Sequence, residues 1–160
     1  MKYFILFFLL IINKNIFAFE LSCLFEEVHQ NGDSHQGVII IKDKKFRYQY
    51  FSRNLYTIIH KDNLFFYVQN SDKTKFFKIN NNSEILEGIV SIIEDYPNIE
   101  KEYYIDRSTI KVEYSATKKI IKRIIILSNE VNMSVYFQEC KNPDIKDFYF
   151  SWSPFWDYNY

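Results

Sequence analysis

Three residue types are scarce in this 160-residue chain, and each scarcity excludes something. The chain has three glycines, three prolines and two cysteines. With so few glycines and no cluster of them, it has no glycine-rich loop to hold a phosphate group. There is also no Pro/Gly-rich linker to divide it into domains. Basic and acidic residues number 20 each and are interleaved, so no basic surface points to nucleic acid.

Long apolar runs are scarce too, and the one clear run lies near the start. Phe4–Ile12 follows Lys2, breaks at Asn13 and is followed by a plausible cleavage end at Ala18, the pattern of a signal peptide over residues 1–18. The run is shorter than the roughly 20 residues of a transmembrane helix, and an uncleaved anchor is the alternative. We expect export to the periplasm and a single mature domain over residues 19–160.

Residues for catalysis are few. His29, His35 and His60 lack the spacing of metal ligands and have no nucleophile near them in the sequence. His29 and His35 flank a predicted turn and are expected to be exposed, and the adjacent acids Glu26 and Glu27 are expected to be solvated. The sequence therefore predicts no enzyme, no cofactor and no metal site.

Alternating aromatic and polar residues are the main positive signal. Between Gly37 and Ile79, four short apolar-aromatic runs follow one another with turn residues between them, which predicts a β-meander. Phe46, Tyr48 and Tyr50 alternate with polar residues, and successive side chains of a strand point to opposite faces. One face of the predicted sheet is therefore lined with aromatic rings.

We expect a mainly β protein, with most strands antiparallel because the connections are too short for crossovers. The expected strands cover residues 19–29, 36–42, 45–52, 55–60, 64–69, 74–79, 100–106, 109–115, 119–127, 131–139 and 147–152.

One segment has the period of a helix instead. Its apolar residues recur at intervals of three and four over residues 84–95, with Ser83 as a possible N-cap and Pro97 as a stop. The stripe consists of Ile85, Leu86, Ile89, Ile92, Ile93 and Tyr96. A lone amphipathic helix must bury its stripe, and the aromatic face of the sheet is the available partner. Helix and sheet would then enclose an apolar space.

Five segments together resemble the periplasmic lipoprotein carriers of the LolA type. They are the strand with Phe46, Arg47, Tyr48 and Tyr50, the turn Lys61-Asp62-Asn63, the strand Leu64–Tyr67, the helix 84–95 with the strand Tyr103-Tyr104-Ile105 after it, and the closing segment Phe148–Pro154. The resemblance implies an open, curved antiparallel sheet, an unclosed half-barrel with one lid helix. It also implies a carrier that shuttles lipoprotein acyl chains from the inner to the outer membrane.

The expected cavity follows from the alternation, the helical stripe and the resemblance together. Its candidate lining residues are Phe46, Tyr48, Tyr50, Phe65, Tyr67, Ile85, Ile89 and Ile93. The partners that the resemblance implies are acylated lipoproteins, an inner-membrane release complex, and an outer-membrane lipoprotein receptor or the membrane itself. We expect the carrier to be a monomer.

The chain departs from the family at three places. It has no amphipathic helix before the first strand. Asp43-Lys44 stands where the family has Arg-Pro. The resemblance implies that a basic residue of this turn helps to control the lid in the family, and we expect that residue to be missing here. Cys23 and Cys140 are additional, and in an oxidising periplasm they would tend to form a disulfide. Two buried free thiols are the alternative.

Two other protein classes remain open. The same side chains could form a solid core with no ligand, because sheets with one buried face look alike in sequence. The aromatic C-terminal end, with Phe155, Trp156, Tyr158 and Tyr160, also suggests a small outer-membrane β-barrel. The charged strand Lys101–Asp106 and the central helix fit a barrel poorly.

The predicted signal peptide leads to a test of location. The mature protein should begin at Phe19 and should be released by osmotic shock without detergent, because cleavage after Ala18 would remove the signal peptide. N-terminal sequencing of the released protein checks this. Recovery of a chain that begins at Met1 in the membrane pellet would show that the segment is an anchor.

Overall fold

The computed structural model of the protein describes residues 20–79, 83–129 and 131–151. The predicted signal peptide lies outside these residues. Ten strands are described: β1 (Glu20–His29), β2 (Ser34–Lys42), β3 (Lys45–Tyr50), β4 (Tyr56–Lys61), β5 (Leu64–Gln69), β6 (Phe76–Ile79), β7 (Glu102–Ile105), β8 (Ser108–Ser115), β9 (Ile120–Leu127) and β10 (Asn132–Lys141). Ten of the eleven predicted strands are thus confirmed, with shifts of a few residues at their ends.

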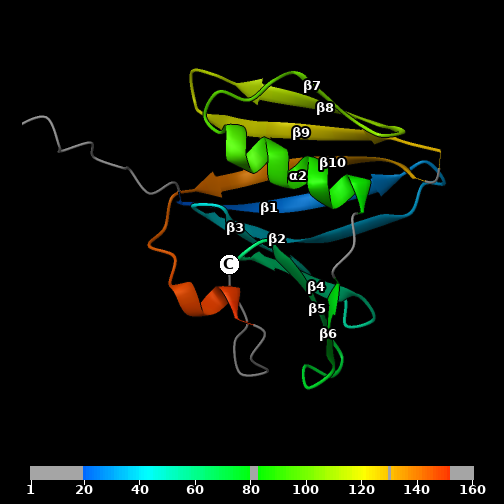
Figure 1. Ribbon diagram of the computed structural model, residues 1–160, viewed down its shortest axis with the longest axis vertical. Coiled ribbons are helices and arrows are strands. Elements are labelled where there is room, and N and C mark those ends of the chain that lie inside the picture. Colours follow the sequence, from blue (N-terminus) through cyan, green and yellow to red (C-terminus); the bar gives the residue numbers. More distant parts are fainter. Residues whose placement is uncertain (1–19, 80–82, 130, 152–160) are drawn as a thin grey trace, which may run out of the picture.

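All ten strands belong to one antiparallel sheet in the order β6-β5-β4-β3-β2-β1-β10-β9-β8-β7 (Figure 1). Strands β1–β6 and β7–β10 each follow the chain order, and the pairing of β1 with β10 joins the two groups. The sheet ends at β6 on one side and at β7 on the other, and these two edges do not pair. The prediction of a mainly β, open antiparallel sheet is therefore confirmed.

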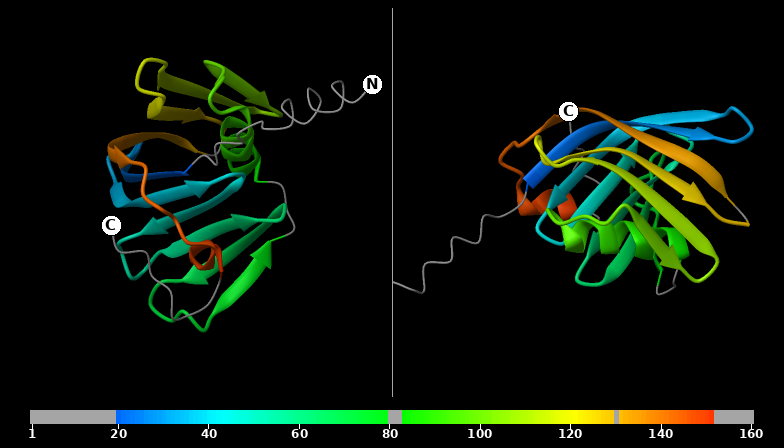
Figure 2. Two further views of the ribbon diagram at one scale, coloured as in Figure 1. Left: turned by 90° about the vertical axis from the view of Figure 1, so that its left-hand side faces the viewer. Right: turned by 90° about the horizontal axis from the view of Figure 1, so that it is seen from above.

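The sheet curves around the side that carries the helix α2 (Glu84–Asp95), as the view from above shows (Figure 2). We call this side the concave face. The helix has the bounds that the sequence predicted. Ser83 occupies the N-cap position, but its side chain makes no capping hydrogen bond. The helix ends just before Tyr96-Pro97, as expected because proline cannot continue a helix.

Local sequence explains the tight connections of the meander. Asp62 and Asn63 form the two-residue turn between β4 and β5, and their φ angles are +54° and +58°. Asp and Asn tolerate this left-handed conformation better than other residues with a side chain.

Gly37 in β2 allows close packing within the sheet, since a Cβ there would lie 2.2 Å from the Gln49 carbonyl oxygen and 2.4 Å from the Phe25 ring. The Phe25 ring occupies the place of the missing side chain.

The apolar residues form two separate clusters, one on each face of the sheet. The larger cluster lies on the concave face, beneath α2. The smaller one lies on the opposite, convex face and contains Val38, Ile40, Ile59, Val68, Ile145 and Phe150. Strand β2 is buried on both faces, which explains why its run Val38–Ile41 is continuously apolar instead of alternating.

The predicted strand 147–152 is wrong. Residues Asp147–Phe150 form a short 3₁₀-helix, η1, that contacts β3 and β4 (Figure 1). Phe150 is buried and Phe148 is 39% exposed, so the two rings do not share one face as strand alternation requires. This segment instead packs on the convex face, where Phe150 and the preceding Ile145 are buried in the smaller cluster. Residues 152–160, including the aromatic end that suggested a barrel, lie outside the described residues.

A disulfide joins the two strands at the centre of the sheet. The sulfur atoms of Cys23 in β1 and Cys140 in β10 are 2.03 Å apart, and the two residues are 117 positions apart in the sequence. Cys23 is almost fully buried in the concave cluster. The bond therefore fixes the one strand pair that connects the two halves of the sheet.

Because this disulfide closes a long loop, its removal should lower the free energy of unfolding. In the loop-entropy model the loss is about 5 kcal/mol. Urea denaturation of the oxidised protein and of the Cys23→Ser, Cys140→Ser double variant measures it. Reduced wild type should unfold like the variant, whereas equal midpoints for the oxidised and reduced protein would contradict the expected contribution.

Candidate functional site

The helix α2 covers the upper part of the concave face (Figure 1). Its stripe faces the sheet as predicted: Leu86, Ile92 and Ile93 are buried, and Ile85 and Ile89 are partly buried against the same cluster. The helix begins with the acids Glu84 and Glu87, which favour the positive end of the helix dipole. The period of the apolar residues thus places one side of α2 against the sheet, and the two acids stabilise the start of the helix.

A glycine sets how closely α2 approaches the sheet. The Cβ of any larger residue at Gly88 would lie 1.9 Å from Cδ1 of Ile110 in β8 and 3.0 Å from Cδ1 of Ile105 in β7. Ile110 is fully buried. The absence of a side chain at position 88 therefore allows the helix to pack directly on β7 and β8.

The structure brings all eight candidate lining residues into the one concave cluster. Phe46, Tyr48, Phe65 and Ile93 are among its buried members, and Tyr50, Tyr67, Ile85 and Ile89 are partly buried against it. The aromatic candidates belong to β3 and β5, whereas the isoleucines belong to α2. Alternation in the strands and the helical period together thus located the apolar face.

The space beneath α2 is almost filled. A cavity of about 20 Å³ remains, close to the smallest volume that holds a water molecule. Of the eight candidates, only Ile89 and Ile93 line it, together with Leu21, Cys23, Ile39, Ile41, Ile92, Ile121, Ile124 and Phe137. The lining is entirely apolar. An acyl chain would fit beneath the helix only if α2 moved away from the sheet.

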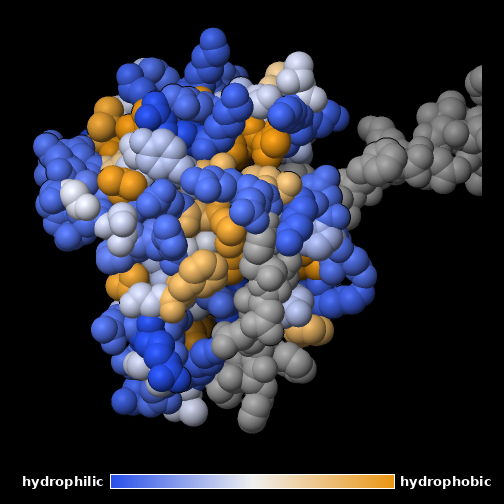
Figure 3. Space-filling model, turned by 180° about the vertical axis from the view of Figure 1, so that it is seen from behind, coloured by the Kyte–Doolittle hydropathy of each residue, from blue (hydrophilic) through white to orange (hydrophobic). Residues whose placement is uncertain are grey.

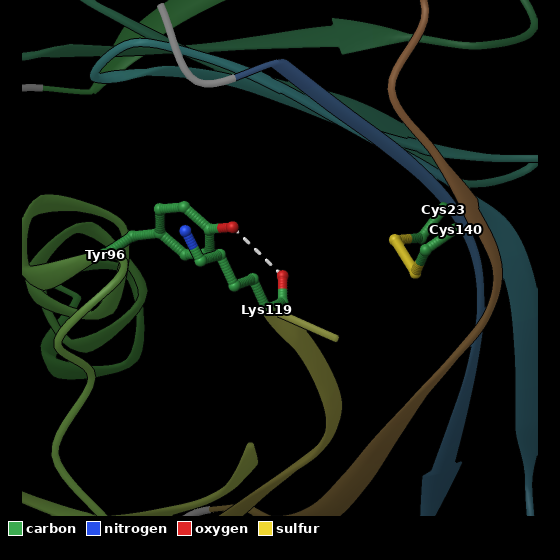
Figure 4. The surroundings of a disulfide bond; sticks show 4 residues. All are labelled: Cys23, Tyr96, Lys119 and Cys140. Carbon is green, nitrogen blue, oxygen red and sulfur yellow. Dashed lines mark hydrogen bonds between the residues drawn. A yellow bond between two sulfur atoms is a disulfide. The ribbon is translucent and has the colours of Figure 1, made fainter. Parts of the chain in front are cut away.

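Polar contacts hold α2 at both of its ends. Near the start, the Ser108 hydroxyl donates to Glu84 at 2.6 Å. Near the end, the Tyr103 hydroxyl donates to Asp95 at 2.9 Å. The hydroxyl of Tyr96 donates to the Lys119 backbone carbonyl at 3.0 Å, on the side opposite the disulfide in Figure 4. These contacts lie at the rim, whereas the middle of the helix has only apolar contacts with the sheet.

The turn between β2 and β3 also contacts the helix. Lys44 Nζ lies 3.1 Å from a carboxylate oxygen of Glu94 in α2. We expected a basic residue to be missing at this turn because Asp43-Lys44 stands in place of Arg-Pro, but Lys44 supplies a basic contact with α2. Both side chains are well exposed, so this ion pair contributes at most about 1 kcal/mol.

A buried acidic residue that the sequence analysis missed lies at one end of the concave face. Glu27 is 4% exposed instead of solvated, and His29 and His35 beside it are half-buried instead of exposed. The strand phase held the signal, because Glu27 follows Leu21, Cys23 and Phe25 at intervals of two. The adjacent acids Glu26 and Glu27 were expected to be solvated together. Because successive side chains of a strand alternate, Glu26 points to the opposite face while Glu27 points into the concave cluster.

Two hydroxyl groups stabilise the Glu27 carboxylate. Tyr48 and Tyr50 donate to its Oε2 atom at 3.0 Å and 2.8 Å. Burial, reinforced by the negative charge of Glu27, raises the pKa of both tyrosines well above the ordinary value. The hydroxyls therefore stay protonated and continue to donate at neutral pH.

A second buried polar residue lies near the other end. His60 is 4% exposed, stacks on Phe46 and lies close to Phe65. Its Nδ1 atom lies 3.1 Å from the Lys44 backbone carbonyl, to which it can donate. Burial lowers the pKa of His60, so that it is neutral at pH 7 and acts as part of the aromatic cluster.

The face opposite α2 is mostly hydrophilic, with smaller apolar patches between charged side chains (Figure 3). Leu127 and Tyr136 are more than a third exposed there. Among the described helices, none has the length and apolar character needed to span a membrane.

Comparison of the sequence with models of protein families and with curated proteins finds no match in either. The geometry of the concave face and the resemblance of the sequence segments therefore carry the functional argument.

The close approach at Gly88 gives a coupled pair of substitutions. Gly88→Ala should destabilise the protein, because the new methyl group would overlap Ile110 Cδ1. In an Ile110→Val background that atom is gone, and the same substitution should be less destabilising, because only the contacts at 3.0 Å with Ile105 Cδ1 and at 3.3 Å with the remaining γ-carbon are tight and alanine favours a helix by about 1 kcal/mol over glycine. Urea denaturation of the four proteins of the cycle measures the coupling. Equal effects of Gly88→Ala in both backgrounds would contradict the packing.

Proposed function

We propose that the protein is a periplasmic carrier that binds the acyl chains of lipoproteins beneath α2 and shuttles them from the inner to the outer membrane. An inner-membrane release complex would supply the cargo, and an outer-membrane receptor or the membrane would accept it. The resemblance to LolA-type carriers supports this proposal. No step of it requires catalysis.

The observation that carries the proposal is the contrast between the two kinds of contact that α2 makes. The helix contacts the sheet through isoleucine and leucine side chains over an entirely apolar lining. Its polar contacts are confined to its ends. An acyl chain could replace the middle of the helix on the sheet without leaving a buried polar group unpaired, because the contacts there are apolar. The buried Ser108 hydroxyl, which donates to Glu84, lies at the start of the helix instead.

In such a carrier the free energy that opening α2 costs is set against the free energy gained when an acyl chain binds. Each CH₂ group transferred from water to an apolar site contributes about 0.8 kcal/mol. Opening the helix exposes apolar surface, and the apparent affinity falls by the fraction of molecules that are open. A cost of a few kcal/mol would keep the empty carrier closed and still allow long chains to enter. It would also allow release to a better acceptor.

One observation favours a second candidate. The interior is nearly filled, with a cavity of about 20 Å³, as in a protein whose concave cluster is a permanent core. In that case α2 would be a structural helix and the protein would bind no acyl ligand. The two candidates differ in what happens when the helix contact is weakened.

A matched pair of core substitutions separates the carrier from the solid core. Ile89 is on the side of α2 that packs against the sheet, whereas Ile59 lies in the convex cluster. Ile→Ala at either site should lower stability, by about 2 to 5 kcal/mol at the fully buried Ile59 and by less at the partly exposed Ile89. For a carrier, Ile89→Ala should maintain or increase uptake of a fluorescent acyl probe relative to wild type, because the open form becomes more populated.

Ile59→Ala is the control, because it lowers stability without loosening the helix. Its uptake should not exceed that of wild type. Thermal unfolding and probe fluorescence are measured on the same samples, below the melting temperature of all three proteins. No uptake by folded wild type and by folded Ile89→Ala would identify a solid core, and equal gains in both variants would show that uptake reports general loosening.

A further inference from the structure

The Glu27 carboxylate is surrounded by donors and aromatic rings. Besides the two tyrosine hydroxyls on Oε2, its Oε1 atom lies 2.7 Å from His29 Nε2. Phe25 stacks on Tyr48 with ring centroids 3.9 Å apart and meets Tyr50 edge-on at 5.4 Å. We call these five residues, Phe25, Glu27, His29, Tyr48 and Tyr50, the Glu27 cluster.

The Glu27 cluster satisfies the hydrogen bonds of the carboxylate but leaves its charge poorly balanced. The two tyrosines are neutral donors, and His29 is charged only when protonated. Among the described residues, no lysine or arginine forms an ion pair with Glu27. A buried anion is costly unless a cation accompanies it. The position therefore has the charge that attracts a cation.

The chemical groups of the Glu27 cluster favour an ammonium group among cations. Ammonium groups bind to carboxylate oxygens through charge-assisted hydrogen bonds and to the faces of aromatic rings through cation–π attraction. Both elements are present within the cluster. His29 and Tyr50 are half-buried, so both side chains reach the solvent-facing side of the cluster.

The cluster also lies in line with the cavity beneath α2. Glu27 and Cys23 are on the same face of β1 and four residues apart, which places them roughly 13 Å apart along the strand. Cys23 lines the cavity. An amphiphile could therefore place its charged end at Glu27 and extend its chain toward α2.

We infer that the Glu27 cluster binds the free primary ammonium group of an acylated cargo. This inference rests on the proposed carrier function and specifies its ligand class. Two sources share this chemistry: an amino-headed phospholipid, and a lipopeptide whose α-amino group is not acylated. An N-acylated lipopeptide lacks the ammonium group and would lose this contact.

The test is a displacement assay with 1-N-phenylnaphthylamine, an uncharged apolar fluorescent probe. Dodecylamine, protonated at pH 7, is compared with dodecanol, below the critical micelle concentration of the amine and the solubility limit of the alcohol. Wild type should release the probe at about tenfold lower concentrations of the amine, the size of effect expected for a charge-assisted hydrogen bond. Glu27→Gln should abolish this preference. Glu26→Gln is the matched control, because it removes the same charge one residue along, on the other face.

Equal displacement by amine and alcohol in wild type overturns the inference, as does a preference that persists in Glu27→Gln. The wild-type comparison holds even if Glu27→Gln does not fold. Failure of the probe to bind at all would overturn the carrier function itself, and the two failures are thereby distinguished. Two further competitors, phosphatidylethanolamine and a diacylated lipopeptide with or without an N-acetyl group, show which source binds.

Discussion

The pairing of β1 with β10 is the constraint on which the rest of the structure depends. It joins the first described strand to the last and turns two separate meanders into one sheet. The disulfide between Cys23 and Cys140 fixes this pairing covalently. The concave face depends on it, because the aromatic strands β3 and β5 lie on one side of the junction and the strands that contact Gly88 of α2 lie on the other. If the pair separated, the helix would cover only one half of its apolar partner.

The sequence predicted the parts of the structure that follow from local period. Strand alternation located ten strands, and a period of three to four located α2 to the residue. These signals are strong because one face of each element is buried and the other is not. The 3₁₀-helix η1 escaped prediction because Phe148, Phe150 and Trp152 imitate strand alternation over a short segment. Whether Phe148 or Phe150 would be buried depends on the convex cluster, which local sequence does not encode.

The sequence predicted which apolar residues share the concave face, but it did not predict how much space they enclose. Alternation in β3 and the stripe of α2 identified the apolar residues, because both are properties of single elements. Whether they enclose a cavity depends on how closely the elements approach, and Gly88 brings the helix near enough to fill most of it. Glu27 was missed for a related reason, since its burial requires two tyrosines from β3 that only the paired sheet brings into reach.

The two edges of the sheet have a consequence for the protein at high concentration. Unpaired strand edges are templates for the addition of other chains, and proteins commonly limit them by keeping edge strands short and charged. Here β6 and β7 have four residues each, the shortest strands of the sheet, and contain Lys78 and Glu102. A chain so rich in isoleucine and aromatic residues would otherwise be prone to aggregate through such edges. Their shortness limits the length of edge to which another chain could add.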